Sequence, residues 1–181
     1  MDKKAIFFDK DRCVGCYACI IACKMQHNAP PYPVAPPEGD PRGLSPINVH
    51  QYGPVIKGDR VYQFYQPLAC MHCQDAPCIQ ACPVAAIFRD PEMDVVLVDR
   101  EKCIGCKFCL WVCPYGAPHF DNVGKMVKCD MCVERLREGK RTACETACIA
   151  RAILVASSEE IAQIQARKAI ERSRNRDTGM T

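Results

Sequence analysis

Short apolar runs separated by polar stretches dominate the hydropathy pattern of this 181-residue chain. Runs rich in β-branched and aromatic residues favour strands, because these side chains pack well on a pleated surface. We therefore expect strands in AIFF at 5–8, VYQFYQPLAC at 61–70, AIF at 86–88, VVLV at 95–98 and RAILVAS at 151–157. The runs AIF and VVLV flank the turn RDPEMD and predict two joined strands. No run approaches the ~20 residues of a membrane span, so the chain is expected not to cross a bilayer.

One helix is expected at the C-terminal end, over residues 157–176. Ser157 and Glu160 have the spacing of a capping box, and basic residues gather at the far end, as the helix dipole favours. The apolar stripe of this segment is modest, so two interpretations stay open. The helix either packs on its own domain or docks on a neighbouring chain, which would include self-association through residues 157–181.

Residues 24–69 form an insertion that holds nine of the fourteen prolines. The run APPYPVAPPEGDPRG at 29–43 cannot be a helix or a central strand, because proline fixes φ and lacks an N–H. We interpret this run as an ordered surface wrap or a loop that faces a partner, with disorder as the alternative.

Cysteine is the outlier of the composition, with 16 residues in four tight groups. The groups are Cys13, Cys16, Cys19 and Cys23; Cys70, Cys73, Cys78 and Cys82; Cys103, Cys106, Cys109 and Cys113; and Cys129, Cys132, Cys144 and Cys148. Neighbours at C-x-x-C spacing seldom satisfy disulfide geometry but readily converge on one metal centre. The start MDKKAIFFDKDRC also lacks the apolar stretch of a secretory signal. We therefore predict metal thiolates and a cytoplasmic location, with a periplasmic one by co-export with a signal-bearing partner as the alternative.

Ligation changes the net charge, which is +3 with neutral thiols. Sixteen thiolates around four cubane cores of about +2 each would bring the loaded protein to roughly −5. The basic pI of 8.1 is thus weak evidence for a nucleic-acid partner, and no nucleic-acid-binding motif is present.

The first and third groups belong to an internal repeat, FFDKDRCVGCYAC and LVDREKCIGCKFC. Their spacing, C-x2-C-x2-C-x3-C, matches the bacterial ferredoxin run that holds cubane clusters, and the second group varies it. Gly15 and Gly105 are expected to let the backbone approach the metal centre. The fourth group is looser and would by itself suit zinc equally well. Its assignment to iron and sulfur rests on pairing, because four groups can pair and three cannot.

Only 20 residues separate Cys82 from Cys103, so residues 70–113 resemble one compact two-cluster ferredoxin. In such a unit each fourth cysteine serves the other cluster. Applied to both pairs of groups, this rule predicts four sites. Site A is Cys13, Cys16, Cys19 and Cys148; site B is Cys129, Cys132, Cys144 and Cys23; site C is Cys70, Cys73, Cys78 and Cys113; site D is Cys103, Cys106, Cys109 and Cys82.

Proline follows the last cysteine of the two middle groups, as Pro83 and Pro114, but not of the outer groups. Lys24 follows Cys23, and Ile149 follows Cys148. The protein backbone is therefore expected to leave these two cysteines differently, at Cys23 into the insertion.

Four groups in this order, with CMHCQDAPCIQACP second, CIGCKFCLWVCPYG third and the split CDMC and CETAC fourth, resemble the iron–sulfur subunits of DMSO reductase-type molybdenum and tungsten oxidoreductases. The resemblance covers about residues 5–156. It implies four 4Fe-4S clusters in a line, in a non-catalytic subunit that relays single electrons. The expected partners are a Mo- or W-pterin catalytic subunit and a second redox partner, either a flavoprotein or a membrane quinone-linked subunit. The same kind of subunit serves tungsten aldehyde oxidoreductases, which pass electrons to a flavoprotein.

The expected fold is α+β, with two interleaved ferredoxin-like units. Residues 1–23 and 114–156 would form the outer unit, 24–69 the Pro-rich insertion, 70–113 the inner unit and 157–181 the C-terminal helix. A free polyferredoxin and a zinc-binding structural module are the alternatives.

Several side chains near the cysteines are candidates for supporting roles. His72 is expected to donate a hydrogen bond that tunes a cluster, and the other histidines, His27, His50 and His119, are not expected to be ligands. Trp111 and Phe108 are expected to pack around a cluster and exclude water. Lys24, Lys107 and Lys128 either offset cluster charge or are solvated. No catalytic constellation, phosphate loop or dinucleotide motif is present.

Overall fold

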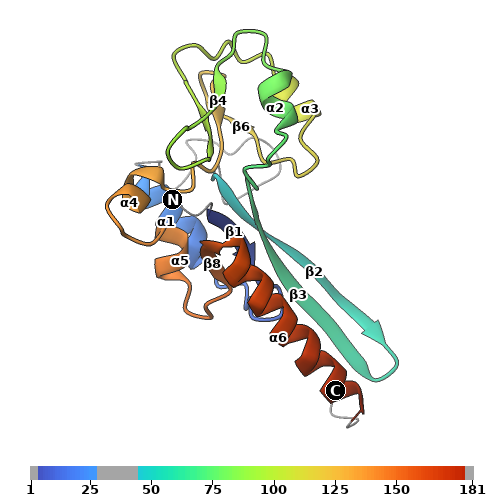
Figure 1. Cartoon of the computed structure of the whole chain (residues 1–181). Coiled ribbons are helices and arrows are strands. Elements are labelled where there is room, and N and C mark those ends of the chain that lie inside the picture. Colours follow the sequence, from blue (N-terminus) through green and yellow to red (C-terminus); the bar gives the residue numbers. More distant parts are fainter. Residues whose placement is uncertain (1–3, 28–44, 178–181) are drawn as a thin grey trace.

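A computed structural model of the protein describes residues 4–27 and 45–177. It has two lobes and an arm that projects from between them (Figure 1). The elements are β1 (Lys4–Phe8), α1 (Ala18–Gln26), β2 (Ile47–Lys57), β3 (Arg60–Ala69), α2 (Pro77–Gln80), β4 (Ile87–Arg89), β5 (Val96–Val98), α3 (Phe108–Trp111), β6 (His119–Phe120), β7 (Met126–Val127), α4 (Val133–Arg137), α5 (Ala143–Ala147), β8 (Ile153–Ser157) and α6 (Ser158–Asp177). The mixed α+β class expected from the sequence is confirmed, and each expected strand run contains a strand.

The lower lobe brings the two ends of the sequence together. β1 pairs antiparallel with β8, with Ile6 opposite Val155, and α1 packs against α5. Both residues are buried, because alternation along each strand turns one face to the core. The first and fourth cysteine groups therefore share one core.

The upper lobe is built from short elements around the second and third cysteine groups. β4 and β5 form one antiparallel pair and β6 and β7 another, with α2 against α3. Among the described residues every sheet has only two strands, and such sheets are marginal in isolation. The core of this lobe contains Cys103 and Cys109 together with small and aliphatic side chains.

The insertion contains a β-hairpin of which only one strand was predicted. β2 pairs antiparallel with β3 along most of its length, with a register shift between Tyr52 and Val55 at Gly53 and Pro54. Glycine and proline at 53–54 interrupt the alternation that marks a strand, and a bulge absorbs them. The proline-rich run 29–43 lies outside the described residues.

The hairpin is buried at its base and exposed toward its tip. Ile47, Val49 and Ala69 are buried, whereas Ile56 and Val61 near the turn are exposed. The hairpin and α6 extend in the same direction from the lower lobe (Figure 1).

The capping box at the start of α6 is confirmed. The Ser157 N–H donates to Glu160 Oε2 at 2.9 Å, and the Glu160 N–H donates to Ser157 Oγ at 3.2 Å. No helix of the described part of the protein is both long and apolar enough to cross a membrane.

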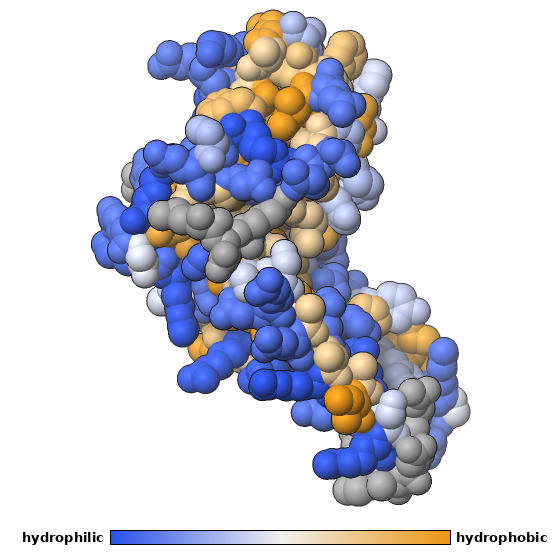
Figure 2. Space-filling view, viewed as in Figure 1, coloured by the Kyte–Doolittle hydropathy of each residue, from blue (hydrophilic) through white to orange (hydrophobic). Residues whose placement is uncertain are grey.

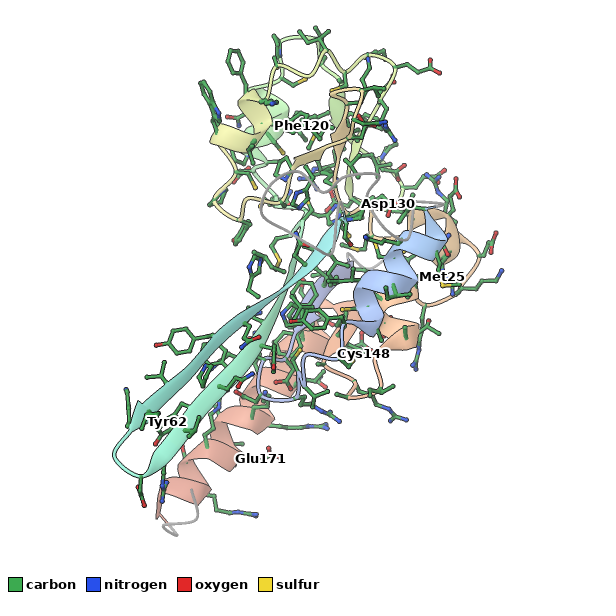
Figure 3. All side chains as sticks on the ribbon, turned by 180° about the vertical axis from the view of Figure 1, so that it is seen from behind. Met25, Tyr62, Phe120, Asp130, Cys148 and Glu171 are labelled. Carbon is green, nitrogen blue, oxygen red and sulfur yellow. The ribbon has the colours of Figure 1, made fainter. Side chains whose placement is uncertain are left out.

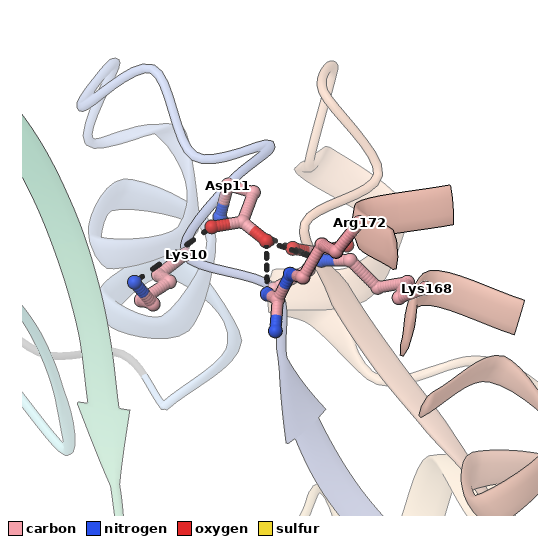
Figure 4. Close-up of polar contacts among 5 residues, drawn as sticks. Lys10, Asp11, Lys168 and Arg172 are labelled. Atoms are coloured by element: carbon pink, nitrogen blue, oxygen red, sulfur yellow. Dashed lines mark hydrogen bonds and ion pairs between the residues drawn. The ribbon is translucent and has the colours of Figure 1, made fainter. Parts of the chain in front are cut away.

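Ion pairs fix α6 to the turn that precedes the first cysteine (Figure 4). Lys168 donates to Asp9 and, at 2.9 Å, to Asp11, and Arg172 donates to Asp11 at 2.6 Å. Hydrogen bonds from these two cations lower the pKa of Asp11 to about 2. The face of α6 that carries Lys168 and Arg172 thus packs on its own domain, as one of the two interpretations expected. Self-association through residues 157–181 stays a prediction.

Apolar surface gathers on the upper lobe, whereas much of α6 is hydrophilic (Figure 2). The exposed apolar side chains of this lobe include Phe88, Ile104, Phe108, Trp111 and Tyr115. Most of them lie between Cys103 and Cys113, the segment of the third cysteine group that contains α3.

Candidate metal centres

Three hollows in the structure are each lined by four cysteines. The set Cys13, Cys16, Cys19 and Cys148 lines one, Cys23, Cys129, Cys132 and Cys144 the second, and Cys82, Cys103, Cys106 and Cys109 the third. These are the residues of sites A, B and D.

Three of the four cysteines of site C lie near one another. Cys78 is close enough to Cys70 and Cys113 for their charges to raise its pKa, although burial is the larger cause. Cys73 follows Cys70 by three residues in the same loop. In Figure 3, Phe120, which lines the hollow of site D, lies in the upper lobe, Asp130, which lines that of site B, lies between the lobes, and Cys148 of site A lies in the lower lobe.

The hollow at site B bears on the choice between zinc and a cluster. A structural zinc ion holds four sulfurs at about 2.3 Å, so its ligands close around it. The four cysteines of site B line a hollow, as do those of site A. The assignment of site B to a cluster and not to zinc stays a prediction.

Burial keeps these thiols protonated until metal binds. Burial, reinforced by the charge of Cys144, raises the pKa of Cys19 to about 12, and burial raises the pKa of Cys109 and Cys132 to about 11. Ligation must therefore release protons, and its affinity rises with pH. A bound polynuclear cation would supply positive charge that offsets the negative charge of the four thiolates.

Backbone N–H groups point at the sulfurs and would stabilise them as thiolates. Ala86 donates to Cys82 Sγ at 3.2 Å, Ala152 donates to Cys148 Sγ at 3.1 Å, and Met131 donates to Cys129 Sγ at 3.3 Å. Hydrogen bonds of this kind tune cluster potentials.

The exits from Cys82 and Cys148 have the same geometry although only the first is followed by proline. In each, the residue three positions on has positive φ, 50° at Ala85 and 49° at Arg151, and the next N–H turns back to the cysteine. The expectation that Cys148 is left differently is therefore wrong. Ile149 occupies an exposed position where no proline is needed to form the turn.

The exit from Cys23 does differ, as expected. α1 runs through Cys23 and ends at Gln26, and Lys24 is buried within its last turn. Proline at 24 would sit in the helix interior, where its ring clashes with the preceding turn. Lysine permits the helix to continue past the last cysteine.

The histidines take different positions. His72 is buried, and its Nδ1 accepts the Val96 N–H at 3.0 Å. Burial, with the charge of Lys128 second, lowers the pKa of His72 to about 3, so the ring is neutral. His72 Nε2 is buried and has no hydrogen-bond partner among the described residues, and its donation to a cluster stays a prediction. His27 lies 3.4 Å from Asp130, His119 lies 3.1 Å from Asn48, and His50 is exposed.

Two of the predicted supporting side chains lie at the surface. Trp111 is 78% exposed and touches Phe108, which is also exposed, so the prediction that they exclude water from a cluster is wrong for the protein by itself. Lys107 is exposed and lies over the Phe120 ring. Phe108 and Trp111 lie three residues apart on one face of a helix, whereas the buried Cys109 of α3 lies on another face.

The sequence analysis did not predict that residues of the β2–β3 hairpin line the hollows of sites A and B. Val49 and Pro67 line the hollow of site A, and Ile47 and Ala69 line that of site B. The alternation of I-N-V at 47–49 was the available signal. The base of the insertion thus closes both hollows of the lower lobe.

Gly15 and Gly105 have positive φ, 67° and 72°, and each lies against another segment. A Cβ at Gly15 would overlap the Tyr65 ring, and one at Gly105 would overlap the Gly124 carbonyl. The structure thus gives these glycines a close approach to protein, and their approach to a metal centre stays a prediction.

We expect Gly105→Ala to destabilise the loaded protein more than Gly116→Ala. Both substitutions put alanine at positive φ, which costs about 1–3 kcal/mol, but Gly116 has open space around its Cβ position. The measurement is the thermal midpoint under anoxia, with Gly116→Ala as the matched control. Equal midpoints for the two variants would contradict the close approach to Gly124.

Two family models, both described as a 4Fe-4S dicluster domain, match residues 61–158 and 12–86. A sulfite dehydrogenase subunit of Allochromatium vinosum is 36% identical, over 85% of this sequence and 68% of the relative. A polypeptide of the anaerobic dimethyl sulfoxide reductase of Haemophilus influenzae is 33% identical, over 89% and 77%. The formate dehydrogenase iron-sulfur subunit of Wolinella succinogenes is 31% identical, over 92% and 87%.

Proposed function

The protein belongs to the 4Fe-4S dicluster family of iron–sulfur subunits of molybdenum and tungsten oxidoreductases, and from this premise we propose that it relays single electrons through four 4Fe-4S clusters. Sites A to D would each hold one cluster through the four cysteines assigned to it. The convergence of four cysteines on each of three hollows carries this proposal.

The proximity of cysteines from different sites supports a single path. Cys109 of site D is near Cys78 of site C, and Cys19 of site A is near Cys144 of site B. Lys128 acts on Cys78 of site C and on Cys129 of site B. The order along the path is then D, C, B, A.

The two end sites are also those nearest to the surface. Cys16 of site A and Cys106 of site D are exposed, whereas the described cysteines of the other sites are buried or half-buried. Val14 and Ile104, which are equivalent in the repeat, are 59% and 63% exposed beside them. Electrons would enter and leave at these two ends, because tunnelling partners must approach the terminal clusters closely.

Two interleaved ferredoxin-like units would hold the path. The pairing of β1 with β8 and of α1 with α5 supports an outer unit from both ends of the sequence. Phe120 and Met126 line the hollow of site D, so the packing of the inner unit would extend beyond residue 113.

Each cluster, when bound, would accept and release one electron. The protein would hold the clusters by thiolates, donate N–H groups to their sulfurs and transform no substrate itself. The partners would be a Mo- or W-pterin catalytic subunit at one end and a flavoprotein or quinone-linked subunit at the other. Both the DMSO reductase type and the tungsten aldehyde oxidoreductase type of catalytic subunit are compatible with this role.

Elemental analysis of the complex, isolated from its native host without air, tests the proposal. We expect about sixteen iron atoms per chain, together with molybdenum or tungsten in a co-purifying subunit. About twelve iron atoms with one zinc would overturn the assignment of site B. Sixteen iron atoms with neither heavy metal would overturn the relay in favour of a free polyferredoxin.

A further inference from the structure

A buried polar junction joins the segments that carry sites B and C. The Val96 N–H donates to His72 Nδ1 at 3.0 Å, and the Val96 carbonyl accepts a hydrogen bond from Lys128 Nζ. Lys128 also donates to the Cys129 carbonyl at 2.9 Å. The junction thus connects the loop of Cys70 and Cys73, strand β5 and the start of the fourth cysteine group.

Lys128 is 6% exposed, and an ammonium group buried so deeply needs a countercharge. Removing an unpaired charge from water costs several kcal/mol even after the protein relaxes. Among the residues that the structure describes, the hydrogen bonds of Lys128 end on carbonyl oxygens and not on a carboxylate. Carbonyl dipoles lower the cost, but the neutralising negative charge must come from elsewhere.

The cysteines of two sites lie around the junction and can supply that charge. Lys128 Nζ donates to the backbone of Cys129 in site B, and its other acceptor, Val96, donates to His72, which stands between Cys70 and Cys73 of site C. The other charges near the junction are more exposed or are already paired. Asp90, which is also 6% exposed, accepts from Arg137 at 2.7 Å. The side chain of Asp130 is 34% exposed and faces His27, and Arg89 donates to Asp94 and to the Cys73 carbonyl.

We infer that Lys128 is the shared counter-ion of sites B and C and raises the reduction potentials of both. A buried cation stabilises the additional negative charge that reduction brings, and the low local dielectric strengthens the effect. An electron would then be held more tightly in the middle of the path than if Lys128 were neutral. The role rests on the proposed function, because Lys128 can tune clusters only if sites B and C hold them.

The test is a redox titration of the intact protein in its complex, followed by EPR under anoxia, with iron content measured on each sample. Lys128→Gln removes the charge and keeps an N–H donor, and Lys128→Arg keeps both. Lys125→Met is the matched control, because Lys125 donates to the carbonyl of Cys103 at site D and not at the junction.

We expect Lys128→Gln to make the reduction of two of the four clusters at least tenfold less favourable. Their reduction potentials would then fall by at least about 59 mV, the tenfold change for one electron. Lys128→Arg should keep the original potentials, and Lys125→Met should leave the two affected signals unchanged. Loss of these two clusters from Lys128→Gln with full iron in Lys128→Arg would also support the inference.

Unchanged potentials in Lys128→Gln would overturn the inference, and so would an equal shift of all four. A loss of iron in both Lys128 variants would likewise overturn it, because it would mean that shape and not charge matters. These results leave the relay intact when the unaltered protein holds sixteen iron atoms. A deficit of iron in the unaltered protein, by contrast, would count against the proposed function itself.

Discussion

Removal of iron and sulfide is expected to abolish the cooperative unfolding transition of this protein. The two buried cores of the described residues contain seven buried cysteines between them, and every described sheet has only two strands. Without clusters the three hollows would be empty, and the residues that line them would lose the contacts that a closely packed core requires. Because binding energy of this kind is folding energy, its loss should exceed the ~5–15 kcal/mol stability of an ordinary domain.

Circular dichroism and hydrogen exchange under reducing, anoxic conditions would measure this effect. Chelation should remove protection from β1, β4, β5 and β8, which line the cores. Reconstitution with iron and sulfide should restore it, which separates loss of metal from irreversible damage. A chelated protein that kept a cooperative transition within a few degrees of the loaded one would contradict the expectation.

Single cysteine substitutions should reveal the crossed ligation as a pattern of lost signals. Cys148→Ala should remove the same EPR signal as Cys16→Ala, and Cys23→Ala the same signal as Cys129→Ala. Each substitution is expected to lower the iron content by up to about four atoms per chain, because a cubane needs its fourth thiolate for stability. The physical basis is that the fourth cysteine of each outer group lines the hollow of the other group.

Ile149→Ala is the matched control for Cys148→Ala. Ile149 is the next residue and is exposed, so its substitution should retain all the iron. If Cys23→Ala and Cys16→Ala removed one and the same signal, each group would hold its own cluster and the crossed assignment would be wrong.

Much of the local structure was predictable because it depends on neighbours in the sequence. The β-branched run at 95–98 predicted β5, and Ser157 with Glu160 predicted the start of α6. The two copies of the repeat also share a local geometry, because both have a left-handed residue at the helix start, at Tyr17 and Lys107. Spacing alone also predicted the cysteine sets that the structure brings together around three hollows.

β2 was missed because its local signals conflict. Gly53 and Pro54 end a strand in most sequences, and only pairing with β3 over the rest of the hairpin offsets their cost. Trp111 was placed wrongly for a related reason, since an aromatic residue inside a cysteine run reads as core. Trp111 is exposed because it lies with Phe108 on the face of α3 that is turned away from the core, whereas Cys109 lies on the buried face.

By itself the sequence determined the chemistry of the sites, because ligand type and spacing are local properties of a loop. Only the tertiary structure decided which charges are buried beside those loops. The sequence left Lys128 either solvated or offsetting charge, and the fold buries it against Val96, 32 residues away. It likewise brings the base of the hairpin over sites A and B. Burial depends on which distant segments pack together. Hydrophobic periodicity within one segment predicts that segment's buried face but not the segment that packs against it.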